Sequence, residues 1–152
     1  MPTQANTTGT QKQIADTIFE GVFEKSHDFR IEMPFDMACQ FIRRIDSYNE
    51  FDSLTVLDAL GRVDRLIPRI QYGDNNPNNW QRDYKISVGR EGSPVLYIER
   101  YEWGWNQSPL AQQAMADICH GMKAVGKADE VTCMVEDTGT NGRKLTFRFW
   151  WD

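Results

Sequence analysis

The sequence predicts an α+β fold, a two-layer sandwich in which helices pack on one face of an antiparallel sheet. Segments with a helical spacing of apolar residues are interleaved along the chain with segments in which apolar and polar residues alternate. From His27 to Glu136 these segments follow a β-α-β-β-α-β order, which is the ferredoxin-like order. A further helix precedes this unit and a further strand follows it. We expect residues 1–9 to form a disordered tail and residues 10–152 a single domain.

The first half of the chain alternates between helical and strand patterns. Thr10 and Gln13 have the spacing of a capping box, which indicates the start of an amphipathic helix. Residues 27–33 alternate between apolar and charged side chains, which predicts a half-buried strand. The helical spacing then returns, and it predicts helices over 35–48 and 53–67.

The second half begins with a segment rich in Asn, Gly and Pro, which favours a loop over 71–81. A helix is expected to begin at Ser108, because Ser108 can cap it and Pro109 suits its first position. The remaining segments alternate and predict two hairpins. Their strands cover residues 83–90, 94–103, 129–136 and 143–151.

The apolar pattern also chooses a register for each hairpin, because a slip of one residue moves every side chain to the other face. In each hairpin one register builds an apolar face and also places opposite charges across from each other. The first hairpin is predicted to pair Val88 with Leu96, Ile86 with Ile98 and Lys85 with Glu99. The second is predicted to pair Val135 with Leu145, Cys133 with Phe147, Val131 with Phe149 and Glu136 with Lys144.

These registers place an aromatic stripe on the outer face of the first hairpin. Trp150 is expected on the outer face of the second hairpin, and Trp151 on the core side. The stripe ends where Trp80 and Trp105 are expected to approach Trp103, and nearby arginines supply charge. The candidate binding residues are Trp80, Arg82, Tyr97, Arg100, Tyr101, Trp103 and Trp105.

Composition excludes several classes of protein. The chain has 152 residues, of which 40% are hydrophobic, and this suits one domain that folds without disulfides. No apolar run reaches the roughly 18 residues of a membrane helix, and the polar N-terminus does not resemble a signal peptide. The irregular spacing of Cys39, Cys119 and Cys133 disfavours both a disulfide framework and a zinc site. We therefore expect a cytoplasmic protein with no cofactor and no bound metal.

The net charge of −5 disfavours a broad electrostatic contact with nucleic acid, although nucleic acid is not excluded as a partner. The charge is uneven, since residues 1–60 carry −5 and residues 61–90 carry +3. Catalytic groups are few. Cys119 and His120 are adjacent on a helix, so their side chains diverge by about 100° and cannot act as a nucleophile and its base.

Our leading hypothesis is a non-enzymatic module that binds a protein partner, or a second copy of itself, through the aromatic stripe. The acidic segment 1–60 suggests an inhibitor of a nucleic-acid-handling enzyme. A second hypothesis is a binder of a small ligand, a nucleotide or single-stranded nucleic acid, with Arg82 or Arg100 holding the anion. A third is a small enzyme that uses His120 as a base. If instead the N-terminal helix covers the stripe, its aromatics are only core residues.

Overall fold

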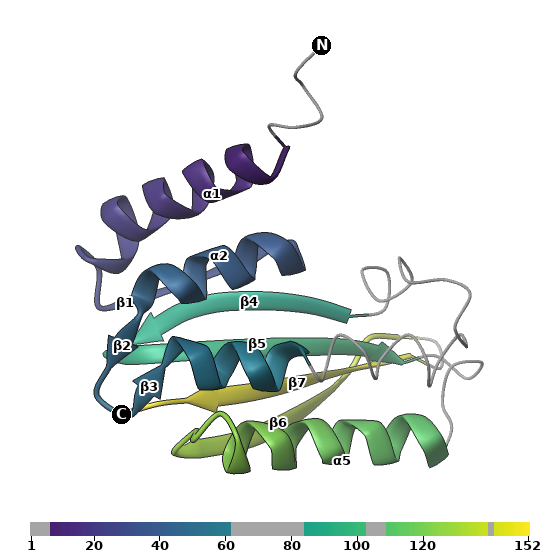
Figure 1. Cartoon of the computed structure of the whole chain (residues 1–152). Coiled ribbons are helices and arrows are strands. Elements are labelled where there is room, and N and C mark those ends of the chain that lie inside the picture. Colours follow the sequence, from purple (N-terminus) through teal and green to yellow (C-terminus); the bar gives the residue numbers. More distant parts are fainter. Residues whose placement is uncertain (1–6, 62–83, 103–108, 140–141) are drawn as a thin grey trace.

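The computed structural model describes residues 7–61, 84–102, 109–139 and 142–152 (Figure 1). The helices are α1 (Thr7–Ile18), the π-helix η1 (Phe19–Phe23), α2 (Phe35–Ile45), a helix over 53–61, and α5 (Pro109–Ala124). Five strands form the main sheet: β1 (Asp28–Met33), β4 (Tyr84–Glu91), β5 (Ser93–Glu102), β6 (Glu130–Asp137) and β7 (Arg143–Trp150). A separate small ladder joins β2 (Ser47–Tyr48) to β3 (Phe51–Asp52).

The main sheet has the order β1-β4-β5-β7-β6, and every neighbouring pair is antiparallel. The predicted mixed α+β architecture is therefore confirmed. The ferredoxin-like order is not confirmed, because β2 and β3 interrupt it along the chain and β1 lies at an edge beside β4. At the other edge, β7 is inserted between β5 and β6. Strands β5 and β6 consequently run in the same direction, and α5 connects them.

Both hairpin registers are confirmed, including the pairs of Lys85 with Glu99 and of Glu136 with Lys144. The registers could be predicted from local sequence, because only one register places all the apolar side chains of each hairpin on one face. That face carries Ile86, Val88, Leu96, Ile98, Phe147 and Phe149, all of which are buried in the core.

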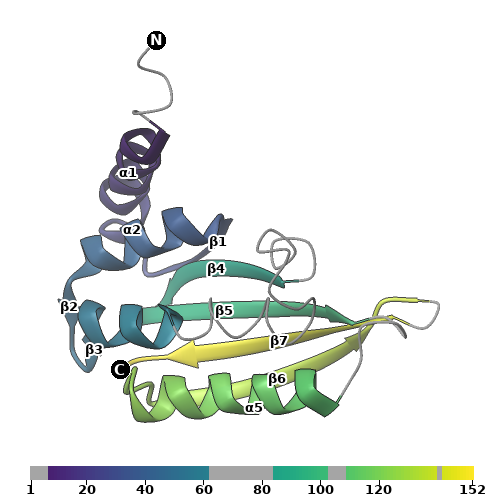
Figure 2. The same ribbon diagram turned by 45° about the vertical axis from the view of Figure 1, so that its right-hand side comes forward.

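The helices cover this apolar face of the sheet (Figures 1 and 2). Trp151 is buried with them, as predicted, and its indole Nε1 donates a hydrogen bond of 2.6 Å to the carbonyl oxygen of Gly126. Its ring also contacts Phe51 edge to face, with the centroids 5.1 Å apart. In this way the C-terminus ties β7 to the end of α5 and to β3.

Helix α1 packs on α2 and begins at Thr7, three residues before the predicted cap at Thr10. Phe19 and Phe23 stack with centroids 5.0 Å apart, and both rings meet Phe41 of α2. This aromatic cluster packs η1, which continues α1, against α2 within the helical layer. The N-terminal helix therefore does not cover Tyr97 and Tyr101, the described aromatics of the stripe, which lie on the other side of the sheet.

Arg90 holds the helical layer to the sheet from a buried position on β4. Its guanidinium donates to the carbonyl oxygen of Phe23 at 2.8 Å and to the hydroxyl of Tyr48 at 2.9 Å. It also lies over both of those rings, 5.1 Å from each centroid. One side chain thus joins η1, β2 and β4. None of the helices in the described part of the chain is both long enough and apolar enough to cross a membrane.

Candidate interaction surface

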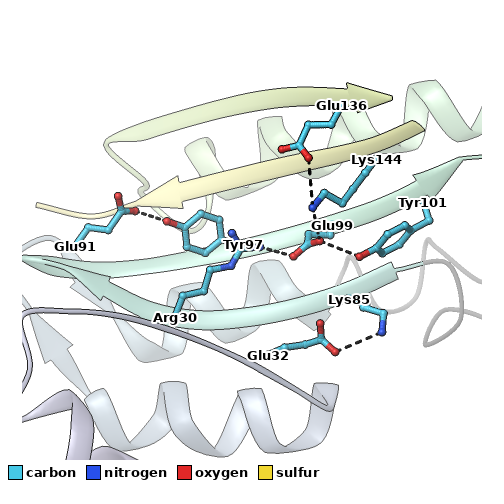
Figure 3. A network of polar contacts seen from close by, with 9 residues as sticks. All are labelled: Arg30, Glu32, Lys85, Glu91, Tyr97, Glu99, Tyr101, Glu136 and Lys144. Carbon is cyan, nitrogen blue, oxygen red and sulfur yellow. Dashed lines mark hydrogen bonds and ion pairs between the residues drawn. The ribbon is translucent and has the colours of Figure 1, made fainter. Parts of the chain in front are cut away.

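The face of the sheet opposite the helices, called here the open face, carries a network of charged and aromatic side chains (Figure 3). Alternation along the strands and the observed registers place its members on one surface. They are Arg30 and Glu32 from β1, Lys85 and Glu91 from β4, Tyr97, Glu99 and Tyr101 from β5, Lys144, Arg148 and Trp150 from β7, and Glu130, Met134 and Glu136 from β6.

Glu99 lies at the centre of the network. It forms a close ion pair with Arg30, accepts a hydrogen bond of 3.0 Å from the hydroxyl of Tyr101, and lies 3.6 Å from the ammonium of Lys144. These partners come from β1, β5 and β7. The carboxylate is therefore held from three sides, although it lies on a face that no helix of the described residues covers.

Tyr97 is the second junction. The guanidinium carbon of Arg30 lies 3.9 Å from the centroid of the Tyr97 ring, which is the geometry of a cation–π contact. The Tyr97 hydroxyl donates a hydrogen bond of 2.5 Å to Glu91. Glu91 also accepts from Arg148 at 2.8 Å, and its backbone carbonyl accepts from the indole of Trp150 at 3.1 Å.

Small side chains on β4 allow Arg30 to reach these partners. Arg30 pairs with Gly89, and Tyr97 pairs with Ser87, so Arg30 passes over β4 where that strand presents little bulk. At Gly89 an added Cβ would lie 2.2 Å from the carbonyl oxygen of Phe29, so any larger residue would also force β1 away. The sequence analysis missed Arg30, and the signal that would have found it is this pair of small residues on an otherwise bulky strand.

The network shifts the pKa of its members. Burial alone would raise the pKa of Glu91, but hydrogen bonds from Arg148 and Tyr97 outweigh it and hold the pKa below its usual value. Burial, together with the hydrogen bond to Glu91, raises the pKa of Tyr97 to about 12. Burial and the hydrogen bond to Glu99 raise the pKa of Tyr101 to about 12. Both phenols therefore stay neutral hydrogen-bond donors through the physiological range.

Each cation of the open face among the described residues is paired with a carboxylate. Arg148 is shared between Glu91 at 2.8 Å and Glu130 at 3.0 Å. Lys144 lies 3.6 Å from both Glu99 and Glu136, and Lys85 lies 3.5 Å from Glu32. A phosphate would have to compete with these glutamates for each cation. The open face is consequently poorly suited to bind a polyanion.

The predicted binding residues divide into three groups. Tyr97 and Tyr101 lie on the open face, as expected. Arg100 lies on the opposite face with no exposed surface, and its Nε donates to Glu102 at 2.9 Å. Its role as an anion-binding neighbour of Tyr101 is therefore wrong, because alternation turns consecutive residues of a strand to opposite faces. The other predicted residues lie outside the described part of the chain: Trp80, Arg82, Trp103 and Trp105.

A pocket of about 260 Å³ lies on the helical side of the sheet, between α5, β6 and β7. Its wall is mostly apolar and includes Met115, Ala116 and Cys119 from α5 and Cys133 from β6. Burial and the neighbouring Cys133 raise the pKa of the Cys119 thiol to about 11, so this thiol is not activated as a nucleophile. His120 is exposed and does not line the pocket.

Within the described residues, no cluster of three or more histidine, cysteine or acidic side chains is arranged to hold a metal ion. Comparisons with models of protein families, with curated proteins and with solved structures find no match to this chain. Its function is therefore inferred from the chemistry of the open face.

Proposed function

We propose that the protein is a non-enzymatic interaction module that docks a protein partner on the open face of its sheet. The observation that carries this proposal is the tethering of Tyr97, which lies between the guanidinium of Arg30 at 3.9 Å and the carboxylate of Glu91 at 2.5 Å. Tyrosine, tryptophan and arginine are the residues most enriched at the energetic centres of protein interfaces. Here they share one surface that none of the described helices covers.

The network lowers the entropic cost of docking. Immobilising a flexible side chain on binding costs about 0.5–1.5 kcal/mol. Arg30, Tyr97 and Arg148 are already held by their ion pairs and hydrogen bonds, so less of this freedom remains to be lost. An ordered surface of this kind favours a partner whose shape and charges are complementary.

The alternative of a nucleotide or nucleic-acid binder is less well supported. Arg90 and Arg100 are buried on the helical side, where they bind groups of the protein itself. The cations that remain on the open face are already paired with glutamates. The acidic charge of residues 1–60, of which β1 lies at the edge of the open face, favours a partner with a basic surface. An enzyme that handles nucleic acid would have such a surface, and this protein would then act as its inhibitor.

Site-specific photo-crosslinking tests the proposal. A benzophenone side chain at Lys85, on the open face, should yield an adduct with one protein of defined mass in cells. The same group at Leu54, which is 73% exposed on the helical side, should yield no such adduct. Tyr101→Ala should abolish the adduct from Lys85 while the circular dichroism spectrum is unchanged.

Three results would contradict the proposal. Equal adducts from Lys85 and Leu54 would mean that the open face is not the docking surface. Unfolding of Tyr101→Ala would make this aromatic a structural residue. An adduct with the mass of a second copy would show that the partner is the protein itself.

A further inference from the structure

A second surface lies at the free edge of β6, the outermost strand on the α5 side (Figures 1 and 2). Among the described residues, no strand pairs with β6 on its outer side. All but one of its residues are exposed, and the exposed fractions of Met134 and Val135 reach 57% and 55%. These are large apolar side chains on a strand whose outer backbone groups face no other strand.

Proteins normally protect such an edge with lysine, proline or a bulge. β6 contains neither residue, and its register against β7 is continuous from Glu130 to Asp137. The opposite edge differs in where its charges lie, since β1 carries Asp28, Arg30 and Glu32 at alternate positions and is followed by a proline. The acidic residues of β6 lie only at its ends, so its middle from Val131 to Val135 has no charge that would oppose an added strand.

We propose that the edge of β6 binds an extended segment of a partner protein as an additional strand, with basic residues at both ends of that segment and an apolar residue in its middle. This goes beyond the docking surface proposed above, because it uses the outer backbone edge of β6 and the pocket on the helical side, although the side chains of Glu130, Met134 and Glu136 border both surfaces. The main-chain ladder would provide affinity and the side chains would provide selectivity, as in other cases of strand addition.

The pocket beside α5 is the reason for expecting an apolar residue in the middle of the added segment. Cys133, which lies in the central part of β6, belongs to its wall, together with Met115, Ala116 and Cys119 from the helix. A residue directly opposite Cys133 on an added strand would have its Cβ about 5 Å from that of Cys133, on the same face. Its side chain would therefore lie next to the pocket, between the new strand and α5.

The acidic residues at the ends of β6 are the reason for expecting basic residues at the ends of the added segment. Glu130 and Glu136 keep 54% and 47% of their side-chain surface exposed. Each shares its β7 cation with a second glutamate, since Arg148 also binds Glu91 and Lys144 also lies near Glu99. A surplus of negative charge therefore remains at both ends of the strand.

The same charges disfavour a second copy of this chain as the occupant. In the antiparallel register that pairs Cys133 with its own copy, Glu130 faces Glu136 of the second copy. In the next register, Glu130 faces Asp137. Like charges directly opposite each other on neighbouring strands are destabilising.

A synthetic peptide tests the proposal on the full-length protein. Its ends are lysines, its body alternates valine and threonine, and its centre is leucine. Binding is measured by fluorescence anisotropy, and protection of individual backbone amides by hydrogen exchange. We expect saturable binding and new protection of the outward amides of β6. A peptide with glutamates in place of the lysines should bind about tenfold more weakly or worse.

Two pairs of variants give matched controls. Met134→Lys adds a charge to the exposed edge and should abolish binding, whereas Leu54→Lys makes the same change on an exposed site elsewhere and should have no effect. Ala116→Trp obstructs the pocket and should remove the advantage of central leucine over central alanine in the peptide. Ala124→Trp, on an exposed site of the same helix, should preserve that advantage.

The proposal is overturned if the peptide leaves the β6 amides unprotected, or if the lysine and glutamate peptides bind equally. It is also overturned if Leu54→Lys weakens binding as much as Met134→Lys, since net charge would then explain the effect. Protection of β6 that rises with protein concentration in the absence of peptide would identify a second copy as the occupant, against the proposal.

Discussion

The hydroxyl of Tyr97 donates a hydrogen bond of 2.5 Å to the carboxylate of Glu91, which Arg148 also binds at 2.8 Å. The phenol and the guanidinium come from different strands, β5 and β7, and Glu91 stands at the end of a third strand, β4. This contact ties three strands together on the open face. Its strength depends on the ionised form of Glu91, which gives it a defined pH dependence.

We expect the stability contributed by Glu91 to be lost in acid. The folded state holds the pKa of Glu91 below the usual 4.5, so folding favours the ionised form. This contribution is fully present above pH 4.5 and declines as the pH falls through the folded-state pKa. The urea midpoint of Glu91→Gln should therefore lie below that of the wild type at neutral pH and approach it in acid. Glu50→Gln, an exposed site, is the control, and an equal change there would contradict the assignment to the network.

In alkali, the contribution of Tyr101 to stability changes with pH in the opposite direction to that of Glu91. Its pKa is raised from 10.0 to about 12, so its contribution to stability is fully present below pH 10.0 and is lost as the pH rises through 12. Ultraviolet absorbance should show phenolate forming late in the folded protein. Tyr101→Phe should remove one late-titrating group while the component from Tyr97 remains. A titration complete near pH 10.0 in the folded protein would refute the hydrogen bond to Glu99.

Arg90→Met should destabilise the fold by about 3 kcal/mol, because it leaves the buried carbonyl of Phe23 without its charged donor. Urea denaturation followed by tryptophan fluorescence measures this loss. Arg43→Met, at an exposed position on α2, is the matched control and should change stability by less than about 0.5 kcal/mol. Equal losses in the two variants would show that Arg90 does not hold the helical layer to the sheet.

Glu102→Gln should cost about 4 kcal/mol, because it removes the buried carboxylate that the guanidinium groups of Arg100 and Arg143 both bind. The double variant Arg100→Met with Glu102→Leu removes both charges and should be more stable than Glu102→Gln alone. Thermal and urea unfolding of both variants give the comparison. A double variant less stable than the single one would mean that the Arg100–Glu102 ion pair contributes more to stability than the burial of its charges costs.

Several parts of the fold could be predicted because they depend on neighbouring residues. The two hairpin registers follow from alternation and from the pairs Lys85–Glu99 and Glu136–Lys144, all within short stretches of chain. Alternation also turns Arg100 and Tyr101 to opposite faces, which is why the binding role predicted for Arg100 from its charge is wrong. The short ladder of β2 and β3 was missed, since two strands of two residues carry too little pattern to detect.

The sequence by itself determined which side chains share a face: the position of Trp151 in the core and of Tyr97 and Tyr101 on the open face follow from the two-residue period of a strand. Only the tertiary structure decided what lies across from them. It placed α1 on α2 and not on the open face, brought Arg30 of β1 over small residues of β4 to Tyr97, and left the edge of β6 unpaired among the described residues. The physical reason is that a residue's own periodicity sets its direction, whereas its partners depend on contacts between segments far apart in the chain.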